Sequence, residues 1–227
     1  MRRIPFDCGS LDTLLEGGVE SSCVTLLYGE AGTGKTNLCL VLARNVALQG
    51  KKVVYLDTEG VSLDRFRQIC GESFDKVLKS VLFFEANSFD EQEKMVDKAI
   101  KLAEGNAEVD MIIVDSITMF YRLTSQQEDR SERRSLTSQS IKLHGVSRRR
   151  DIPVVLTSQV YTDVERGTFE SLGGRPLQHN AKTIIRLDRV APGRRRAVII
   201  KHRNIAEEAS AEFRLSSAGI DCESRKG

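Results

Sequence analysis

The chain has 227 residues, of which 40% are hydrophobic and 29% are charged, and its formal net charge is only +2. This composition is ordinary for a globular protein with a sizeable core, and no apolar run approaches the roughly 18 residues of a membrane-spanning helix. Residues 1–10 hold no apolar signal-peptide core, so we expect a cytoplasmic protein with a single domain over residues 1–227.

Cysteine spacing argues against a metal or redox centre. No C-x-x-C pair occurs, and no cysteine lies near a histidine at the spacing of a zinc site. We therefore expect reduced, mostly buried thiols. The five cysteines are Cys8, Cys23, Cys39, Cys70 and Cys222.

In chain order, a leucine-rich helical turn at 11–15 comes first, and we expect it to pack on an edge of the sheet. Apolar runs of strand length then alternate with stretches of helical period, which predicts an α/β fold with a parallel sheet and right-handed crossovers. Ser62 and Ser88 are predicted helix caps. Strands are expected at 24–28, 53–57, 81–85, 111–115 and 153–158, and helices at 37–49, 62–71, 88–104 and 131–150.

Two segments of the second half lack periodicity. Residues 117–132 are polar and are predicted to form a mobile loop, and residues 161–176 contain glycine and mixed charges and are predicted to form a long functional loop. Residues 183–188 and 197–201 alternate and flank a turn, which predicts a hairpin, and 212–215 is a last short strand. Antiparallel strands are therefore expected to extend the parallel sheet.

One glycine-rich stretch carries the strongest chemical signal. It fits the pattern G-x-x-x-x-G-K-[ST], and a predicted strand precedes it while a predicted helix follows it. In such a P-loop, backbone N–H groups cradle phosphates, the lysine reaches the β- and γ-phosphates, and the hydroxyl ligates Mg²⁺. The sequence therefore predicts an ATP and Mg²⁺ site formed by Gly29, Glu30, Ala31, Gly32, Thr33, Gly34, Lys35 and Thr36.

Polar residues at the ends of three other strands complete this site. Asp115 ends an apolar strand and is predicted to hold Mg²⁺ together with Thr36, the alternative being a capping aspartate. Glu59 is the candidate base that activates water, ahead of Glu30, although an acid at a helix start would read the same way. Gln159 is a candidate γ-phosphate sensor that signals to 161–176, or else a polar strand end.

Arginine clusters suggest a nucleic-acid surface. Residues 1–113 carry a net charge of −5 and residues 114–227 carry +7, although a solvated basic face is the plain alternative. Tyr161 and Phe169 can stack on unpaired bases, and Gly173-Gly174 allows close backbone contacts. The side chains predicted to neutralise phosphates are Arg148, Arg149, Arg150, Arg166 and Arg175.

Together these motifs resemble the RecA/RadA recombinase superfamily, and within it the archaeal RadB branch of short RadA paralogues. The likeness covers nearly the whole chain and implies a RecA-like P-loop NTPase core. Its most specific parts are residues 29–36, Asp57-Thr58-Glu59-Gly60, Val114-Asp115-Ser116 and Thr157-Ser158-Gln159-Val160.

The resemblance implies roles at matching positions. Glu59 matches the catalytic glutamate, Asp115 the Walker B acid and Gln159 the γ-phosphate sensor. Residues 117–130, with Arg122, and residues 161–176 match the two DNA-binding loops. Lys201 and Arg203 resemble a basic pair that reaches the ATP of a neighbouring subunit in the bacterial branch.

The departures from the pattern shape the expected function. Only 23 residues precede the first strand, so we expect no N-terminal helical domain, no docking linker and no long filament. The resemblance then implies an accessory protein of homologous recombination that binds ATP and single-stranded or branched DNA, hydrolyses ATP weakly and modulates the main RadA-type recombinase. The alternatives are a KaiC-like signalling ATPase or kinase and a partner-binding scaffold with structural ATP.

Overall fold

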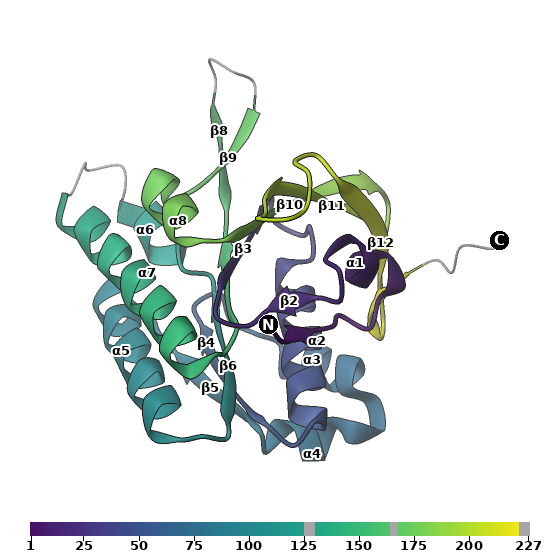
Figure 1. Cartoon of the computed structure of the whole chain (residues 1–227), viewed down its shortest axis with the longest axis horizontal. Coiled ribbons are helices and arrows are strands. Elements are labelled where there is room, and N and C mark those ends of the chain that lie inside the picture. The colour runs from purple at the N-terminus through teal and green to yellow at the C-terminus, as the bar shows by residue number, and fades with distance from the viewer. Residues whose placement is uncertain (125–129, 164–167, 223–227) are drawn as a thin grey trace.

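The computed structural model describes residues 1–124, 130–163 and 168–222. Within them, nine strands form one mixed sheet in the order β13-β12-β11-β10-β3-β7-β6-β4-β5 (Figure 1). The strands from β10 to β5 are mutually parallel, and β11, β12 and β13 are antiparallel. Their bounds are β3 (Val24–Gly29), β4 (Lys52–Asp57), β5 (Val81–Glu85), β6 (Val109–Asp115), β7 (Val154–Ser158), β10 (Thr183–Ala191), β11 (Arg194–Lys201), β12 (Ser210–Ser216) and β13 (Gly219–Asp221). The predicted α/β fold with an antiparallel C-terminal extension is therefore confirmed.

Helices cover both faces of the sheet, and each face has its own hydrophobic core. This explains why the central strands are continuous apolar runs, since both of their faces are buried. One face carries α2 (Lys35–Leu48), α3 (Leu63–Cys70) and α4 (Phe74–Leu78), and the other carries α5 (Phe89–Gly105), α7 (Arg130–Arg150) and α8 (Gly174–Asn180) (Figure 1).

Local sequence sets the helix ends. The Ser62 hydroxyl accepts the Arg65 N–H, and the Ser88 hydroxyl accepts the Glu91 N–H, so both predicted caps are confirmed. After α3 the chain forms a short 3₁₀ turn, η1 (Gly71–Ser73), and then α4, which the sequence reading did not predict. Phe74 and Val77 of α4 are buried, so packing against the core explains this extra helix.

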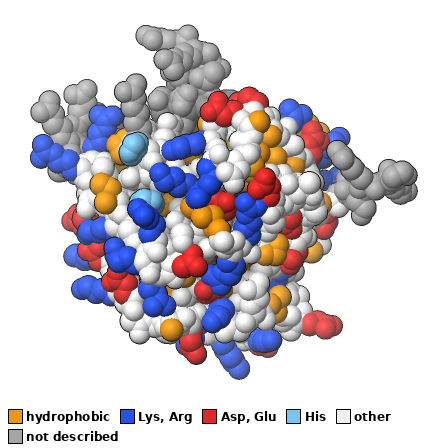
Figure 2. Space-filling model, in the orientation of Figure 1, with side chains coloured by type: hydrophobic (Ala, Val, Ile, Leu, Met, Phe, Trp, Pro, Cys, Tyr) orange, Lys and Arg blue, Asp and Glu red, His pale blue; other side chains and the backbone are white. Residues whose placement is uncertain are grey.

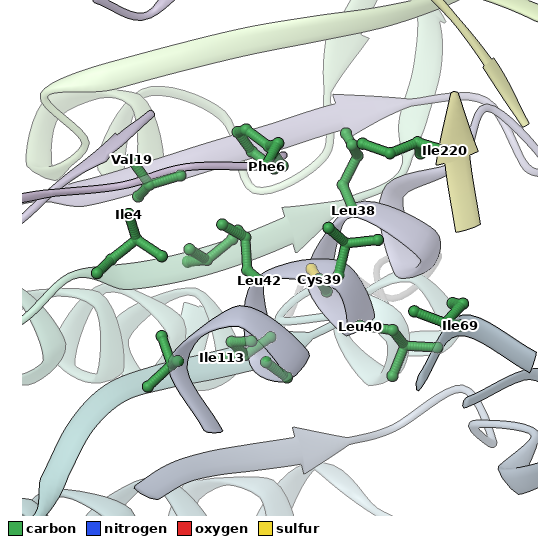
Figure 3. Packing of buried hydrophobic residues seen from close by; sticks show 14 of the residues in the cluster. Ile4, Phe6, Val19, Leu38, Cys39, Leu40, Leu42, Ile69, Ile113 and Ile220 are labelled. Carbon is green, nitrogen blue, oxygen red and sulfur yellow. The ribbon is translucent and has the colours of Figure 1, made fainter. Parts of the chain in front are cut away.

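The N-terminal segment packs over α2. It contains β1 (Arg3–Ile4), α1 (Gly9–Leu14) and β2 (Val19–Glu20), and β1 pairs with β2 in a separate antiparallel ribbon. Figure 3 shows Ile4, Phe6 and Val19 of this segment on the side of α2 where Leu38 and Leu42 lie, with Ile220 of β13 beside Leu38. The helical turn predicted at 11–15 corresponds to α1. Within α1, the Ser10 hydroxyl donates a hydrogen bond to the Glu212 carbonyl of β12 (2.7 Å).

Two predicted loops are partly regular structure, which corrects the sequence reading. Residues Met119–Thr124 form α6, whose Phe120 and Tyr121 pack against the core. In the second segment, β8 (Val160–Asp163) pairs antiparallel with β9 (Thr168–Ser171), and α8 follows. Residues 125–129 and 164–167 lie outside the described residues.

The expectation of five reduced cysteines is wrong for one pair. Cys8 and Cys222 form a disulfide with their Cα atoms 5.3 Å apart, which ties the N-terminal segment to the end of the antiparallel extension. The sequence separation of 214 residues hid this proximity from a reading based on local spacing. Cys23, Cys39 and Cys70 are free and buried, as expected.

The helices in the described ranges include no candidate for a membrane-spanning segment. None of the helices there combines the length and the apolar character that crossing a bilayer requires.

Candidate functional site

The glycine-rich stretch forms the turn between β3 and α2. β3 ends at Gly29 and α2 begins at Lys35, so strand, loop and helix follow each other as predicted. Gly32 and Gly34 have φ angles of +74° and +100°, a region that side chains disfavour. Gly34 is also the N-cap of α2, so the positive end of the helix dipole faces the loop.

The Lys35 side chain turns back into this loop and is buried. Its Nζ donates hydrogen bonds to the carbonyl oxygens of Gly29 (2.7 Å) and Glu30 (3.0 Å). Burial lowers the pKa of Lys35, and the nearby carboxylates of Glu59 and Asp115 act in the opposite direction. The lysine therefore lies within electrostatic reach of both predicted acids.

Asp115, at the end of β6, is almost fully buried. Its carboxylate accepts hydrogen bonds from the Tyr55 hydroxyl (2.8 Å) and the Thr157 hydroxyl (2.5 Å). Burial raises the pKa of Asp115, whereas its hydrogen bonds from Thr157, Tyr55 and Thr36 lower it. Thr36 and Asp115, the two predicted magnesium ligands, therefore lie close enough for the Thr36 hydroxyl to affect the pKa of Asp115.

Glu59 and Gln159 meet at the same edge of the sheet. The Gln159 amide donates a hydrogen bond to Glu59 Oε1 (2.9 Å), across 100 residues of sequence. The sheet register explains this contact. Asp57 of β4 lies opposite Asp115 of β6, and Val114 of β6 lies opposite Leu156 of β7, so β4 and β7 end at nearly the same level. All the predicted catalytic and metal-binding residues thus gather where parallel strands end.

Asp57 shapes the turn that holds Glu59, a role that the matching motif Asp57-Thr58-Glu59-Gly60 did not indicate. Asp57 Oδ1 accepts the backbone N–H groups of Glu59 (3.0 Å) and Gly60 (2.9 Å), and Oδ2 accepts that of Val61 (2.6 Å). An aspartate that bonds backbone N–H groups two to four residues ahead is the signal of such a turn. Asp57 therefore organises the turn although its own side chain is buried.

We expect Asp57→Ala to lower the free energy of unfolding by about 2–3 kcal/mol, because it leaves three backbone N–H groups without their charged acceptor. Urea denaturation measures this change. Asp64→Ala, which removes an exposed acid from the first turn of α3, is the control and should cost under about 1 kcal/mol. Equal losses in the two variants would contradict the role given to Asp57.

Hydrogen bonds continue from this edge to the β8–β9 hairpin. The Thr118 hydroxyl donates to Ser158 Oγ (3.2 Å) and accepts the Gln159 N–H (3.3 Å). The Ser158 hydroxyl donates to the Leu172 carbonyl (2.9 Å), and the Leu172 N–H donates to the Gln159 carbonyl (2.8 Å). Gln159 is therefore connected directly to the segment that follows β9.

The three arginines of the run 148–150 have different partners, because successive helical residues point about 100° apart. Arg149 pairs with Glu104 of α5 (2.6 Å), and an Arg150 Nη donates to the Asn106 carbonyl (3.5 Å). Arg148 lines one hollow together with Arg149 and His144, and it also lines a groove of about 320 Å³ with His144, Lys182 and Arg203. Figure 2 shows Lys, Arg and His side chains gathered over α7 and α8.

The remaining predicted nucleic-acid residues are placed as follows. Gly173 and Gly174 mark the start of α8, with φ angles of +90° and +56°. The backbone of Arg122 belongs to α6 and that of Arg175 to α8, but their side chains and the whole of Arg166 lie outside the described part of the chain, as do the side chains of 161–170. Their roles stay predictions.

Lys201 and Arg203 contact groups within this chain. Lys201 Nζ donates to the carbonyls of Gln178 and Ala181, both at 2.8 Å. Arg203 lies 3.5 Å from the Glu20 carboxylate and donates to the Cys23 sulfur (2.6 Å). A role for this pair across a subunit interface stays a prediction.

Comparison with known proteins agrees with this geometry. A model of the Rad51 family matches residues 2–223. A "DNA repair and recombination protein RadB" from Methanococcoides burtonii is 46% identical, over 94% of this chain and 95% of the relative, and one from Archaeoglobus fulgidus is 42% identical, over 97% and 100%. A crystal structure described as that of the RadB recombinase superposes with a TM-score of 0.83 at 31% identity, covering 97% of this chain and 100% of that one. The chain therefore belongs to the Rad51/RecA family, within its archaeal RadB branch.

Proposed function

We propose that the protein binds ATP with Mg²⁺ and DNA, hydrolyses ATP slowly, and serves as an accessory factor that modulates the main RadA-type recombinase in DNA repair. The observation that carries this proposal is the gathering of Lys35, Asp115 and Glu59 at the carboxyl ends of the parallel strands. Its relatives are described as DNA repair and recombination proteins, which supports the biological setting.

The residues fit a magnesium triphosphate. A hydroxyl and a carboxylate, on Thr36 and Asp115, are the oxygen donors that Mg²⁺ accepts, alongside phosphate oxygens and water. Lys35 lies in the loop where it would reach the β- and γ-phosphates, and the loop N–H groups would hold the phosphate oxygens. When bound there, Mg²⁺ would supply positive charge that offsets the negative charge developing on the phosphates.

Glu59 would orient water and accept its proton, and Gln159 would hold Glu59 in place through their hydrogen bond. The Gln159 side-chain amide donates to Glu59, and the Gln159 carbonyl accepts the Leu172 N–H, so one residue joins the reacting centre to the segment that follows β9. This supports a coupling between the nucleotide and the segment that resembles a DNA-binding loop.

We expect Glu59→Gln to slow ATP hydrolysis at least tenfold, since a general base contributes roughly 10²–10⁴ to a rate and we propose slow turnover to begin with. Binding of ATP should change little, because the glutamine amide would keep the shape of the glutamate side chain. Phosphate release under single-turnover conditions measures the rate. Glu30→Gln, at an exposed loop glutamate, is the matched control, and an equal loss there would reassign the base.

The DNA proposal rests on the groove beside α7. Arg148, Lys182 and Arg203 bring three cations to its walls, and Glu20 is the carboxylate near one of them. Burial lowers the pKa of His144, and the nearby positive charges of Lys182 and Arg148 lower it further. Such a strip suits a sugar-phosphate backbone, and single-stranded, duplex and branched DNA compared with and without ATP would identify its preferred form.

A further inference from the structure

Two arginines face each other across the β10–β11 hairpin, next to the phosphate loop. Arg189 of β10 pairs in register with Arg195 of β11, so their side chains start from the same face of the hairpin. Two like charges directly opposite each other destabilise a strand pair. The pair lies close to the glycine-rich loop: Leu187 of β10 is opposite Gly29, and Arg189 follows Leu187 by two residues.

Both guanidinium groups bond the outer side of the loop. Arg195 donates from Nε (3.1 Å) and from one Nη (2.9 Å) to the Gly32 carbonyl, and Arg189 donates to the Ala31 carbonyl. A Cβ atom at Gly32 would lie only 2.5 Å from an Arg189 Nη, so the guanidinium occupies the space that a side chain would take. Together with Lys35, these groups bond the carbonyls of four successive loop residues, 29–32.

Neither arginine has a carboxylate partner among the described residues, in contrast to its neighbours on the hairpin. Arg194 and Arg196 both pair with Glu212 (2.6 and 3.0 Å), and Arg186 lies 3.1 Å from Asp188. Burial lowers the pKa of Arg195, and the nearby charge of Arg189 lowers it further. The positive charge of the pair is therefore left at the edge of the loop for an anion to balance.

We propose that Arg189 and Arg195 are positioning residues for the nucleotide. By holding the Ala31 and Gly32 carbonyls outward, they keep the loop N–H groups turned toward the phosphates, and their charge favours a di- or triphosphate over a neutral nucleoside. The inference rests on the proposed ATP site, and it adds a requirement that the P-loop pattern itself does not contain.

The test compares two double variants with the same change in net charge. In Arg189→Gln with Arg195→Gln, we expect ATP and ADP to bind about tenfold more weakly, because the hydrogen bonds from both guanidinium groups to the Ala31 and Gly32 carbonyls and two cations are lost. The control, Arg194→Gln with Arg196→Gln, removes two arginines from the same hairpin that do not contact the loop, and it should bind within about twofold of the wild type. Fluorescent ATP and ADP analogues report the affinities.

A third variant and a second measurement separate positioning from folding. Arg189→Lys with Arg195→Lys keeps both charges and one donor nitrogen at each position, and it should restore most of the affinity. Hydrogen exchange of the amides of 30–34 in the nucleotide-free protein should be faster in the glutamine variant and unchanged in the control. This readout does not require ATP binding.

The outcomes are distinct. Unchanged nucleotide affinity and unchanged loop exchange in Arg189→Gln with Arg195→Gln would overturn the inference, and so would an equal loss of affinity in the control. Wild-type protein that fails to bind ATP would instead overturn the proposed function, and the exchange measurement would still decide whether the arginines hold the loop.

Discussion

Replacing Lys35 with alanine is expected to weaken ATP binding at least 100-fold, which corresponds to about 3 kcal/mol. The ammonium group is buried in the loop and lies among the carbonyls of Gly29 and Glu30, where the surroundings strengthen its attraction to phosphate. Isothermal titration with ATP and Mg²⁺ measures the loss. Lys51→Ala, at an exposed lysine just after α2, is the control and should bind as the wild type does.

The same variant should fold normally, and this separates a binding effect from a structural one. Because burial lowers the pKa of Lys35 in the folded chain, its charge costs stability at any pH below that lowered value. Removing the charge therefore offsets the two lost hydrogen bonds, and alanine is also the better helix former at the first position of α2. A melting temperature within a few degrees of the wild type together with unchanged ATP affinity would contradict the assignment of the phosphate site.

Local patterns were sufficient for much of the fold and for the centre of the site. The P-loop is recognised because its chemistry needs fixed residue types at fixed spacing, and Ser62 and Ser88 are recognised because a cap acts within three residues. Asp115, Glu59 and Gln159 follow from one rule, that parallel strands end at a common edge. Each of these inferences needs only the sequence nearby and a parallel sheet.

The features that were missed depend on contacts between distant segments. The β8–β9 pairing lies in a stretch without clear periodicity, and its register runs from Val160↔Ser171 to Asp163↔Thr168. The Cys8–Cys222 disulfide links the two ends of the described chain. Arg189 and Arg195 become a pair only through the hairpin register, and only the packing of α7 pairs Arg149 with Glu104 and brings Arg148 to the groove with Lys182 and Arg203. Composition indicated a basic second half but not which arginines remain unpaired.

The second large effect is expected on DNA binding, when the cations of the groove beside α7 are removed. Arg148→Gln, Lys182→Gln and Arg203→Gln combined are expected to weaken binding of single-stranded DNA about 100-fold at 0.1 M salt, because each phosphate contact contributes a slope of roughly 0.7 to the logarithm of affinity against that of salt concentration. The slope itself should fall by about 2. Fluorescence anisotropy with a labelled oligonucleotide, over a salt titration, measures both quantities.

A matched control isolates the groove from net charge. Lys51→Gln, Lys76→Gln and Lys79→Gln remove the same three charges from exposed positions outside the groove, and they should leave both the affinity and the slope nearly unchanged. If both triple variants lost the same affinity for DNA, binding would depend on the net charge of the protein and not on the groove. If the groove variant lost no affinity, the DNA would bind at another surface. If the wild-type protein bound no DNA, a signalling ATPase would be favoured. The two measurements therefore decide between a nucleic-acid groove and a solvated basic face, because only a groove in direct contact with phosphates changes the salt slope when its own cations are removed.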